Sequence, residues 1–314
     1  MTEAATLGMG DGGTAQRRGP ICDCCGGTAF DDLYEPVRHR YLRCTGCGSG
    51  QLADRPDADP VHLYDEGYFT GAAHGGYLDY DADAGLHARN AEARLDRIAP
   101  HLPDRRPWRL LDVGCASGYV LNAARARGMD TIGVDPAISA RQRAAEQGHP
   151  VHAELADAVA ALDSAGARLD VACFFQVLEH LAEPAAALAA VATTMDPGAV
   201  LAIETWDLHS RVARLSGKRW QQANPPSVIH LFTLGGVNSM VERAGFEVVA
   251  SSPTSKLVSA GLVAGVAAHR WGPIGRAVRR VASGPLGAVA VPYKLGDLVT
   301  VVAVRRDAPV ASGR

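Results

Sequence analysis

The sequence has no apolar run long enough to cross a membrane. A span needs about 18 or more uninterrupted apolar residues, and Gly, Ser, Arg or Pro interrupts every candidate run. The formal net charge is −3 and the pI is near 6.4, which excludes a protein that coats nucleic acid by electrostatic attraction. The first twenty residues are polar and glycine-rich, without the apolar core of a secretory signal. We therefore expect a cytoplasmic protein. Thiols are kept reduced there, so the seven cysteines are interpreted as metal ligands or buried thiols in preference to disulfides.

With 47% hydrophobic and 21% charged residues, the composition is that of a globular protein. The 314 residues suffice for one large domain and a small appendage. Composition shifts divide the chain into five segments. They are a disordered leader (1–20), a cysteine-rich segment (21–55), a helical and aromatic linker and cap (56–107), a main domain (108–306) with an insertion or lid at 254–296, and a tail (307–314).

The main domain alternates short apolar runs with helical patterns. Apolar runs that read as strands stand at 109–114, 131–135, 151–155, 169–175 and 199–206, and helices are expected over 82–102, 138–147 and 233–244. Two more strands are expected in the FEVVASS and DLVTVVAVRR segments near the C-terminus. Strands that alternate with helices in this way predict an α/β fold with a mostly parallel, doubly wound sheet.

The cysteine-rich segment carries two CxxC pairs, each followed by glycine. Cys22 and Cys25 form the first pair, Cys44 and Cys47 the second, and 18 residues separate Cys25 from Cys44. Two such turns can supply four thiolates in tetrahedral geometry, as in closed structural Zn²⁺ sites. Four thiolates leave no open coordination position, so we expect zinc with a structural role; a chance cluster or disulfides are the alternative. Cys24 lies between two ligands and is expected to be a spectator, the alternative being that Cys22 and Cys24 exchange these roles.

A glycine-rich turn follows the first strand of the main domain, in the segment LLDVGCASGYVL. Gly114, Ala116 and Gly118 let the backbone approach a ligand at a helix N-terminus. Tyr119 stands where an NAD-binding fingerprint would have its last glycine. The next strand ends in Asp135, 21 residues after Gly114, and a carboxylate there can accept hydrogen bonds from ribose hydroxyls. The combination indicates a nucleoside-containing ligand without a pyrophosphate.

With these residues in view, the sequence resembles the class I S-adenosylmethionine-dependent methyltransferases. The resemblance rests on LDVGCASG at 111–118, GVDP at 133–136 and LDVACFFQVLEHL at 169–181. It extends, through the four cysteines, WDLHSRVARLSGKRW at 206–220 and the later HLFT and AGFEVV, to a subgroup with an N-terminal zinc motif that methylates sugars, polysaccharides or small natural products. It implies a Rossmann-like, doubly wound, seven-stranded sheet with a small N-terminal zinc ribbon.

The resemblance also implies a set of cofactor contacts. Asp112, Gly114 and Gly118 would line the methionine end of S-adenosylmethionine, Asp135 would hold the ribose, and Asp157 would lie near the adenine. Gln176 and Glu179 would lie beside the cofactor at the end of the fourth strand. Ala116 departs from the glycine that many members carry there. The full candidate cofactor set is Asp112, Gly114, Cys115, Ala116, Gly118, Asp135, Pro136, Asp157, Gln176 and Glu179.

Methyl transfer from a sulfonium needs alignment and often removal of a proton from the nucleophile. Histidine is the natural base near neutral pH, and two are candidates. His180 ends the VLEH motif at the carboxyl edge of the sheet, where helix capping is the alternative role. His230 lies in a loop expected over the same edge and resembles the catalytic base of related sugar methyltransferases, and packing against Trp206 or Trp220 is its alternative role. Ile229 stands where those relatives often carry an acid, so O-methylation is preferred over C-methylation.

The expected acceptor is a small molecule, most simply a hydroxyl of a sugar, saccharide or natural-product intermediate. The alternatives are a C-methyltransferase acting on a nucleotide-linked keto sugar, an RNA methyltransferase whose ribbon binds RNA, and a scaffold that binds cofactor without catalysis. Nucleic acid is disfavoured because the segment 21–50 is slightly acidic. The apolar and basic segment 257–280 is expected to be a packed lid, with peripheral membrane contact or an anionic substrate as alternatives.

Overall fold

The computed structural model describes residues 20–36, 39–56, 59, 83–264 and 285–307. The expected leader, apart from its last residue, lies outside these ranges, as does most of the aromatic stretch at 58–80. The same is true of most of the tail and of residues 265–284 in the insertion. No helix within the described ranges combines the length and the apolar character that a bilayer crossing requires.

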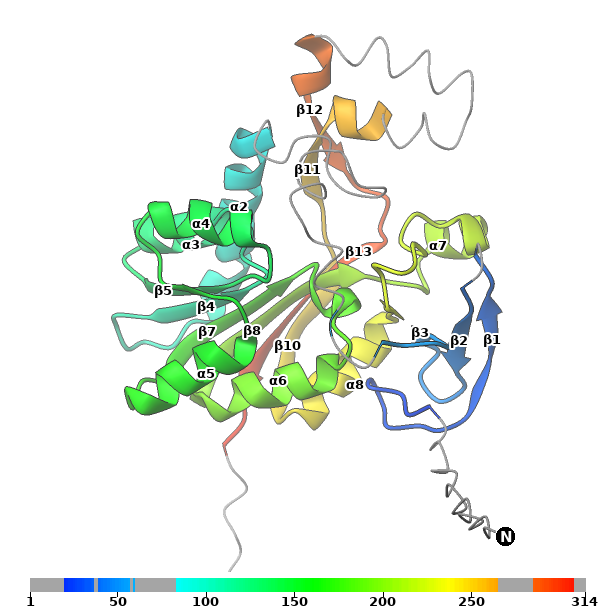
Figure 1. The fold of residues 1–314 in the computed structure, drawn as a ribbon, viewed down its shortest axis with the longest axis horizontal. Coiled ribbons are helices and arrows are strands. Elements are labelled where there is room, and N and C mark those ends of the chain that lie inside the picture. The colour runs from blue at the N-terminus through cyan, green and yellow to red at the C-terminus, as the bar shows by residue number, and fades with distance from the viewer. Residues whose placement is uncertain (1–19, 37–38, 57–58, 60–82, 265–284, 308–314) are drawn as a thin grey trace, which may run out of the picture.

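The main domain is built on one seven-stranded sheet (Figure 1). Its central strands are parallel, and only β13 runs against its two neighbours. The fold expected from the sequence, an α/β Rossmann-like doubly wound sheet of seven strands, is confirmed. In spatial order the strands are β10 (Phe246–Pro253), β13 (Leu298–Arg305), β8 (Met195–Trp206), β7 (Leu169–Phe175), β4 (Arg109–Val113), β5 (Asp130–Val134) and β6 (Val151–His152).

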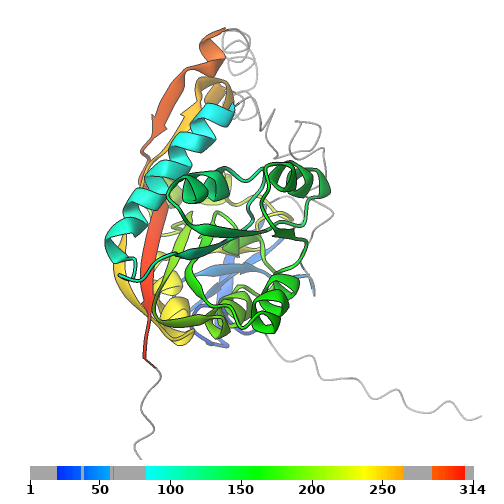
Figure 2. The same ribbon diagram turned by 90° about the vertical axis from the view of Figure 1, so that its left-hand side faces the viewer.

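Helices cover both faces of this sheet (Figures 1 and 2). Strand β7 shows why, since all seven of its residues are buried. Val171 and Cys173 pack in the core on one face, and Ala172 and Phe174 in the core on the other, as the two-residue period of a strand requires. The first face is covered by α2 (Ala84–Ile98), α3 (Tyr119–Ala126) and α4 (Ile138–Glu146), and the second by α5 (Leu155–Ser164), α6 (Pro184–Thr193) and α8 (Leu234–Arg243).

Most element positions follow the sequence pattern, with one clear exception. The strand expected over 151–155 ends at His152, and α5 begins at Leu155. Glu154 is the extended residue before the helix, and Asp157 lies in its first turn, where a carboxylate is favoured by the helix dipole. The helix expected over 82–102 is α2 followed by a short 3₁₀ helix, Ala99–His101.

The cysteine-rich segment forms a small sheet that is joined to the main domain. Its strands β1 (Phe30–Tyr34), β2 (Tyr41–Cys44) and β3 (Gly50–Leu52) are extended by β9 (His230–Leu231), which comes from the loop after β8. Tyr41 is fully buried, and its hydroxyl donates to the carbonyl of Val228 at 2.5 Å. A shared sheet and shared core thus hold the ribbon against the region near the carboxyl end of β8.

The insertion begins as a two-stranded arm above the sheet (Figures 1 and 2). Strand β11 (Lys256–Ser259) pairs antiparallel with β12 (Ala290–Tyr293). The side chain of Asn90 on α2 holds this arm, because its amide donates to the carbonyl of Leu257 at 2.8 Å and accepts from the amide of Leu257 at 2.7 Å. The start of the segment 257–280 is therefore a paired strand, and its residues from 265 on lie outside the described ranges.

Candidate active site

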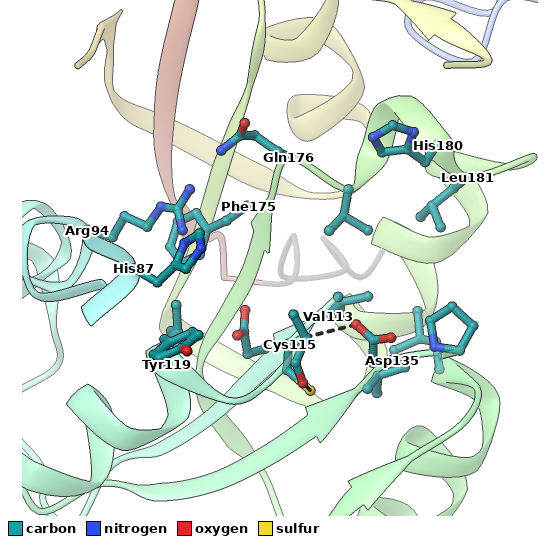
Figure 3. A pocket seen from close by; sticks show the side chains of 18 of the residues that line it. His87, Arg94, Val113, Cys115, Tyr119, Asp135, Phe175, Gln176, His180 and Leu181 are labelled. Atoms are coloured by element: carbon teal, nitrogen blue, oxygen red, sulfur yellow. Dashed lines mark hydrogen bonds between the residues drawn. The ribbon is translucent and has the colours of Figure 1, made fainter. Parts of the chain in front are cut away.

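A cavity of about 690 Å³ lies at the carboxyl ends of β4, β5 and β7. The chain winds from β4 outward to β5 and β6 and then returns to β7 on the other side of β4, so the cavity is at the switch point where open α/β sheets bind ligands. Figure 3 shows side chains from the strand ends and from α2 around this space. Of the ten candidate cofactor residues, seven line it: Asp112, Gly114, Cys115, Ala116, Asp135, Pro136 and Gln176.

The floor of the cavity is the glycine-rich turn after β4. Gly114 has a φ of 76° and no room for a side chain, since a Cβ there would lie 2.3 Å from Cγ2 of Val177. Ala116 also has a positive φ, 46°, which is uncommon for a residue with a side chain. The amide of Ala116 donates to Oδ2 of Asp135 at 2.8 Å. The turn is thus held in a tight conformation by the strand end beside it.

The carboxylate of Asp135 lies at the end of β5 and is 6% exposed. Its Oδ1 accepts from the amide of Ala137 at 2.9 Å, and its Oδ2 from that of Ala116. Burial raises its pKa, and these amides and two nearby arginines oppose that shift. Each oxygen keeps a further lone pair, so this carboxylate can accept hydroxyl donors from the cavity (Figure 3).

Asp112, the last polar residue of β4, is 2% exposed. Burial raises its pKa to about 7, with Asp135 adding to the rise and Arg94 opposing it. A carboxyl group that titrates near neutrality in a buried position is a mark of functional sites. Asp112 is therefore placed where a cationic or hydrogen-bonding part of a ligand would favour its ionised form.

Opposite this floor lies a group of four polar residues, which we call the polar wall: Asn90, Arg94, Gln176 and Lys256. All four line the cavity, and only Gln176 was a candidate. Arg94 pairs with the buried carboxylate of Glu204, and its guanidinium lies 4.7 Å from the ring centre of Phe175. The sequence of α2 does carry a signal for this wall, because His87, Asn90 and Arg94 are spaced so that they share one face of the helix.

Three candidate cofactor residues do not line the cavity. Gly118 is the N-cap residue before α3 and packs against Ala144. Asp157 is exposed on α5, and the lining comes instead from the residues before it, 153–156. Glu179 is 3% exposed and accepts from the hydroxyl of Thr205 at 2.8 Å, which points its carboxylate toward β8 and away from the cavity.

The two candidate bases are placed differently. His180 lines the cavity, and its Nδ1 lies 2.6 Å from the carbonyl oxygen of Ser227. A carbonyl can only accept, so the proton is on Nδ1 and the basic lone pair of the neutral ring is on Nε2. The same contact joins His180 to the loop that leads into β9.

His230 lies in β9, 3% exposed, and is not part of the cavity lining. Its ring is stacked on Phe232 with the centres 5.5 Å apart. Burial lowers its pKa to about 3, and the nearby charge of Arg55 adds to the fall. From the sequence we expected His230 to lie at the edge of the sheet where the substrate binds. In the structure β9 pairs with β3, and the ring of His230 lies in the interface with the ribbon instead.

The four predicted metal ligands converge. The Sγ atoms of Cys22, Cys25, Cys44 and Cys47 all lie within 4.8 Å of one another. Each CxxC pair forms the same turn, since the amide of Gly26 donates to the carbonyl of Cys22 at 2.7 Å and that of Gly48 to Cys44 at 2.9 Å. Tetrahedral Zn²⁺ with Zn–S bonds of about 2.3 Å needs thiolates at such separations, so the donor set fits this ion.

Comparison with known proteins identifies the main domain. Residues 84–251 match the family model described as a methyltransferase domain. The chain is 33% identical over 124 residues to a ubiquinone biosynthesis O-methyltransferase of Aeromonas salmonicida, covering 38% of this chain and 52% of the relative. It is 30% identical over 154 residues to the enzyme of that name from Methylococcus capsulatus, covering 47% and 63%. The chain thus spans about half the length of the curated relatives it matches.

Solved structures also align with the chain, at low identity. An S-adenosylmethionine-dependent methyltransferase from Archaeoglobus fulgidus aligns with a TM-score of 0.45 at 18% identity, covering 79% of this chain and 100% of that one. Magnesium protoporphyrin IX methyltransferase from Synechocystis, with bound S-adenosylhomocysteine, aligns with a TM-score of 0.46 at 13% identity, covering 76% and 91%. Matches this distant carry no information about the substrate.

Proposed function

The chain belongs to the methyltransferase-domain family, and on that premise we propose that it transfers a methyl group from S-adenosylmethionine to a hydroxyl of a small-molecule acceptor. The observation that carries the proposal is the cavity at the switch point, where the Gly114 turn and the buried carboxylate of Asp135 face one space. A turn without room for a Cβ and a strand-end carboxylate are the features that a nucleoside ligand requires.

The residues present fit this cofactor. Asp135 would accept hydrogen bonds from the ribose hydroxyls, and the segment 153–156 would border the base beside it. Asp112 and Arg94, on opposite sides of the cavity, would face the charged methionine end. When bound, S-adenosylmethionine supplies an electrophilic methyl group on a sulfonium. The exposed Asp157 and the buried Glu179, whose carboxylate is bonded to Thr205 on β8, are left out of the proposed contacts.

His180 is the base we propose for the acceptor hydroxyl. It lines the cavity at the carboxyl edge of the sheet, and its hydrogen bond to Ser227 fixes Nε2 as the basic atom. Removing a proton from the hydroxyl makes the oxygen a better nucleophile for in-line displacement. His230 is not proposed as a base, because its ring is buried outside the cavity lining with its pKa lowered to about 3.

A hydroxyl acceptor is favoured over a carbon or nitrogen acceptor because the curated relatives are O-methyltransferases. A saccharide hydroxyl stays within this proposal as one kind of acceptor. An RNA acceptor is disfavoured by the ribbon, in which three arginines are paired with aspartates. The pairs are Arg40 with Asp32, Arg43 with Asp31, and Arg55 with Asp23. Arginines that are neutralised in this way offer little to phosphates.

We also propose that Cys22, Cys25, Cys44 and Cys47 hold one structural zinc ion. The support is the convergence of four sulfur atoms and the two matching turns around them. Cys24, although buried beside them, is not in the set. The ion would stabilise the small sheet formed by β1, β2, β3 and β9, since a segment of this size has little core of its own.

The proposal is tested by calorimetric titration of the full chain with S-adenosylmethionine and S-adenosylhomocysteine. We expect micromolar binding that the Asp135→Ala variant loses, because the variant removes the acceptor at the end of β5. Asp157→Ala is the matched control, since it removes an exposed carboxylate next to the cavity, and its affinity should equal that of the wild type. Folded, zinc-replete wild type that binds neither compound would refute the methyltransferase proposal.

A further inference from the structure

Lys256 lines the cavity from the insertion arm. Its ammonium group donates to Oε1 of Gln176 at 2.6 Å and lies 5.0 Å from the ring centre of Trp206. Among the described residues this is its one hydrogen bond and it has no ion pair, although an ammonium carries three N–H donors. Two donors of a cation on the cavity wall therefore have no oxygen partner within the described protein.

The position of this cation is fixed by its neighbours. The Nε2 of Gln176 donates to Oε1 of Glu204 at 3.0 Å, so the amide oxygen must face Lys256. Gln176 itself has a φ of 60°, a strained conformation for a residue with a side chain and one that clusters at ligand sites. The backbone N–H of Gln176 also donates to the backbone carbonyl of Glu204, at 2.6 Å. Two hydrogen bonds to β8 thus hold Gln176 with its side-chain amide oxygen toward the ammonium.

The polar wall contains two cationic side chains, Arg94 and Lys256, and no acidic one. Arg94 and Lys256 both lie near the carboxylate of Glu204, which accepts hydrogen bonds from Arg94 and from Nε2 of Gln176. The other acids within electrostatic reach of Lys256 are Glu179 and Asp297. Burial raises the pKa of Glu179, which favours its neutral form. Asp297 already accepts from the hydroxyl of Tyr293 and the indole of Trp220.

Burial lowers the pKa of Lys256 to about 8, with Glu204 opposing the fall and Arg94 adding to it. The ammonium is therefore the main form at neutral pH, and it gives up its proton as the pH rises above about 8. A buried cation is costly unless an anion meets it. Glu204 meets part of this cost without a hydrogen bond to the ammonium, and an ionised oxygen placed in the cavity would supply a further negative charge and the missing hydrogen bonds together.

We infer that Lys256 binds an ionised oxygen of the acceptor, so that the acceptor class is an acidic hydroxy compound bearing a phenolate or carboxylate beside the hydroxyl to be methylated. The inference rests on the proposed function and narrows its acceptor. Lys256 fixes the acceptor through its charged oxygen, and His180 faces the same cavity to take the proton of the neighbouring hydroxyl. An anionic oxygen can also belong to the cofactor's own carboxylate, and the experiment separates the two sources.

The probe is 4-nitrocatechol, whose ionised form absorbs visible light, titrated into the full chain saturated with S-adenosylhomocysteine. We expect the wild type to bind it and to favour its ionised form, seen as a lowered apparent pKa of the probe. Lys256→Met should weaken this binding about 10- to 100-fold, the effect of losing a charged hydrogen bond, and abolish the spectral shift. Lys256→Arg should retain most of both. Lys294→Met, an exposed lysine next to β12 on the same arm, should behave as wild type.

The outcomes are distinct. Weak probe binding by Lys256→Met, with the affinity for S-adenosylhomocysteine unchanged, supports the inference and shows that the variant is folded. An equal loss of S-adenosylhomocysteine affinity would assign the ammonium to the cofactor and overturn it. So would a wild type that binds S-adenosylhomocysteine but leaves the probe spectrum unaltered, or that binds neutral 4-nitroveratrole as tightly. Failure of wild-type S-adenosylhomocysteine binding would instead refute the proposed function.

Discussion

The two sides of the cavity are built in different ways. The floor consists of short, contiguous motifs at strand ends, Asp112 to Ala116 and Val134 to Pro136. The polar wall brings together α2, the end of β7 and the insertion arm, so that Lys256 meets a glutamine 80 residues before it in the chain. The floor suits a ligand that all members of a family share, whereas a wall assembled from remote segments can change with the acceptor. Among the following variants, Gly114→Ala tests the floor, and the others test the ribbon and the two histidines near the carboxyl edge of the sheet.

The largest effect is expected from Cys44→Ser. Cys44 is fully buried in the four-cysteine cluster, and apparent binding free energies of structural zinc are about 10–16 kcal/mol. We expect bound zinc to fall well below one per chain and the unfolding temperature to drop sharply. Because the ribbon's sheet continues into β9, turnover should suffer more than cofactor affinity. The measurements are metal analysis, thermal unfolding and calorimetry.

Cys24→Ser is the matched control for that variant. This buried thiol lies outside the ligand set, so the variant should keep its zinc and most of its stability. If Cys24→Ser lost the ion and Cys44→Ser retained it, the proposed ligand set would be wrong.

Gly114→Ala should damage the floor. The added Cβ would lie 2.3 Å from Cγ2 of Val177, and the φ of 76° disfavours any side chain. Relief of the clash must move the turn, so we expect at least a tenfold loss of S-adenosylhomocysteine affinity and a loss of about 1–3 kcal/mol in stability. Gly128→Ala separates strain from clash, because its φ is 77° and nothing lies within 4 Å of its Cβ position. Unaltered cofactor affinity in Gly114→Ala would contradict this account of the floor.

His180→Gln should act on turnover alone. A positioned general base contributes about 10²- to 10⁴-fold to the rate. The rate of methyl transfer from labelled S-adenosylmethionine to hydroxyl acceptors should therefore fall by at least about 100-fold. Calorimetry should show the cofactor affinity of the wild type, and His152→Gln, on β6 and outside the lining, should leave the rate unchanged. Full activity of His180→Gln would mean that another group takes the proton.

The smallest effect is expected from His230→Phe, and it concerns pH. The pKa of His230 falls from 6.5 to about 3 in the folded chain, so the unfolded chain binds the extra proton first as the pH drops. The wild type should therefore lose about 2 kcal/mol of stability from this group between pH 7 and pH 5. The phenylalanine variant, which keeps the stack on Phe232, should lack that loss in denaturant titrations. Equal pH slopes for the two proteins would show that His230 is not buried and neutral.

Several site residues could be found from the sequence because their signals are local. The turn at Gly114 and the carboxylate of Asp135 each follow directly from a strand end, and the four cysteines from their spacing. Arg94, Glu204 and Lys256 could not be found in this way, since their roles come from contacts between segments far apart in the chain. Glu179 adjoins His180 and yet points toward Thr205, because a 3₁₀ helix, Leu178–His180, turns the two side chains apart.

The sequence by itself determined the alternation of strands and helices, the turn that a nucleoside ligand needs, and the two cysteine pairs. These depend on periodicity, on backbone conformation and on ligand spacing within a few residues. Only the tertiary structure decided that β9 joins the ribbon and buries His230, that His180 faces the cavity, and that a lysine from the insertion arm adds a charge to its wall. Those outcomes depend on which strands pair and which surfaces pack across the whole chain, and no local pattern encodes them.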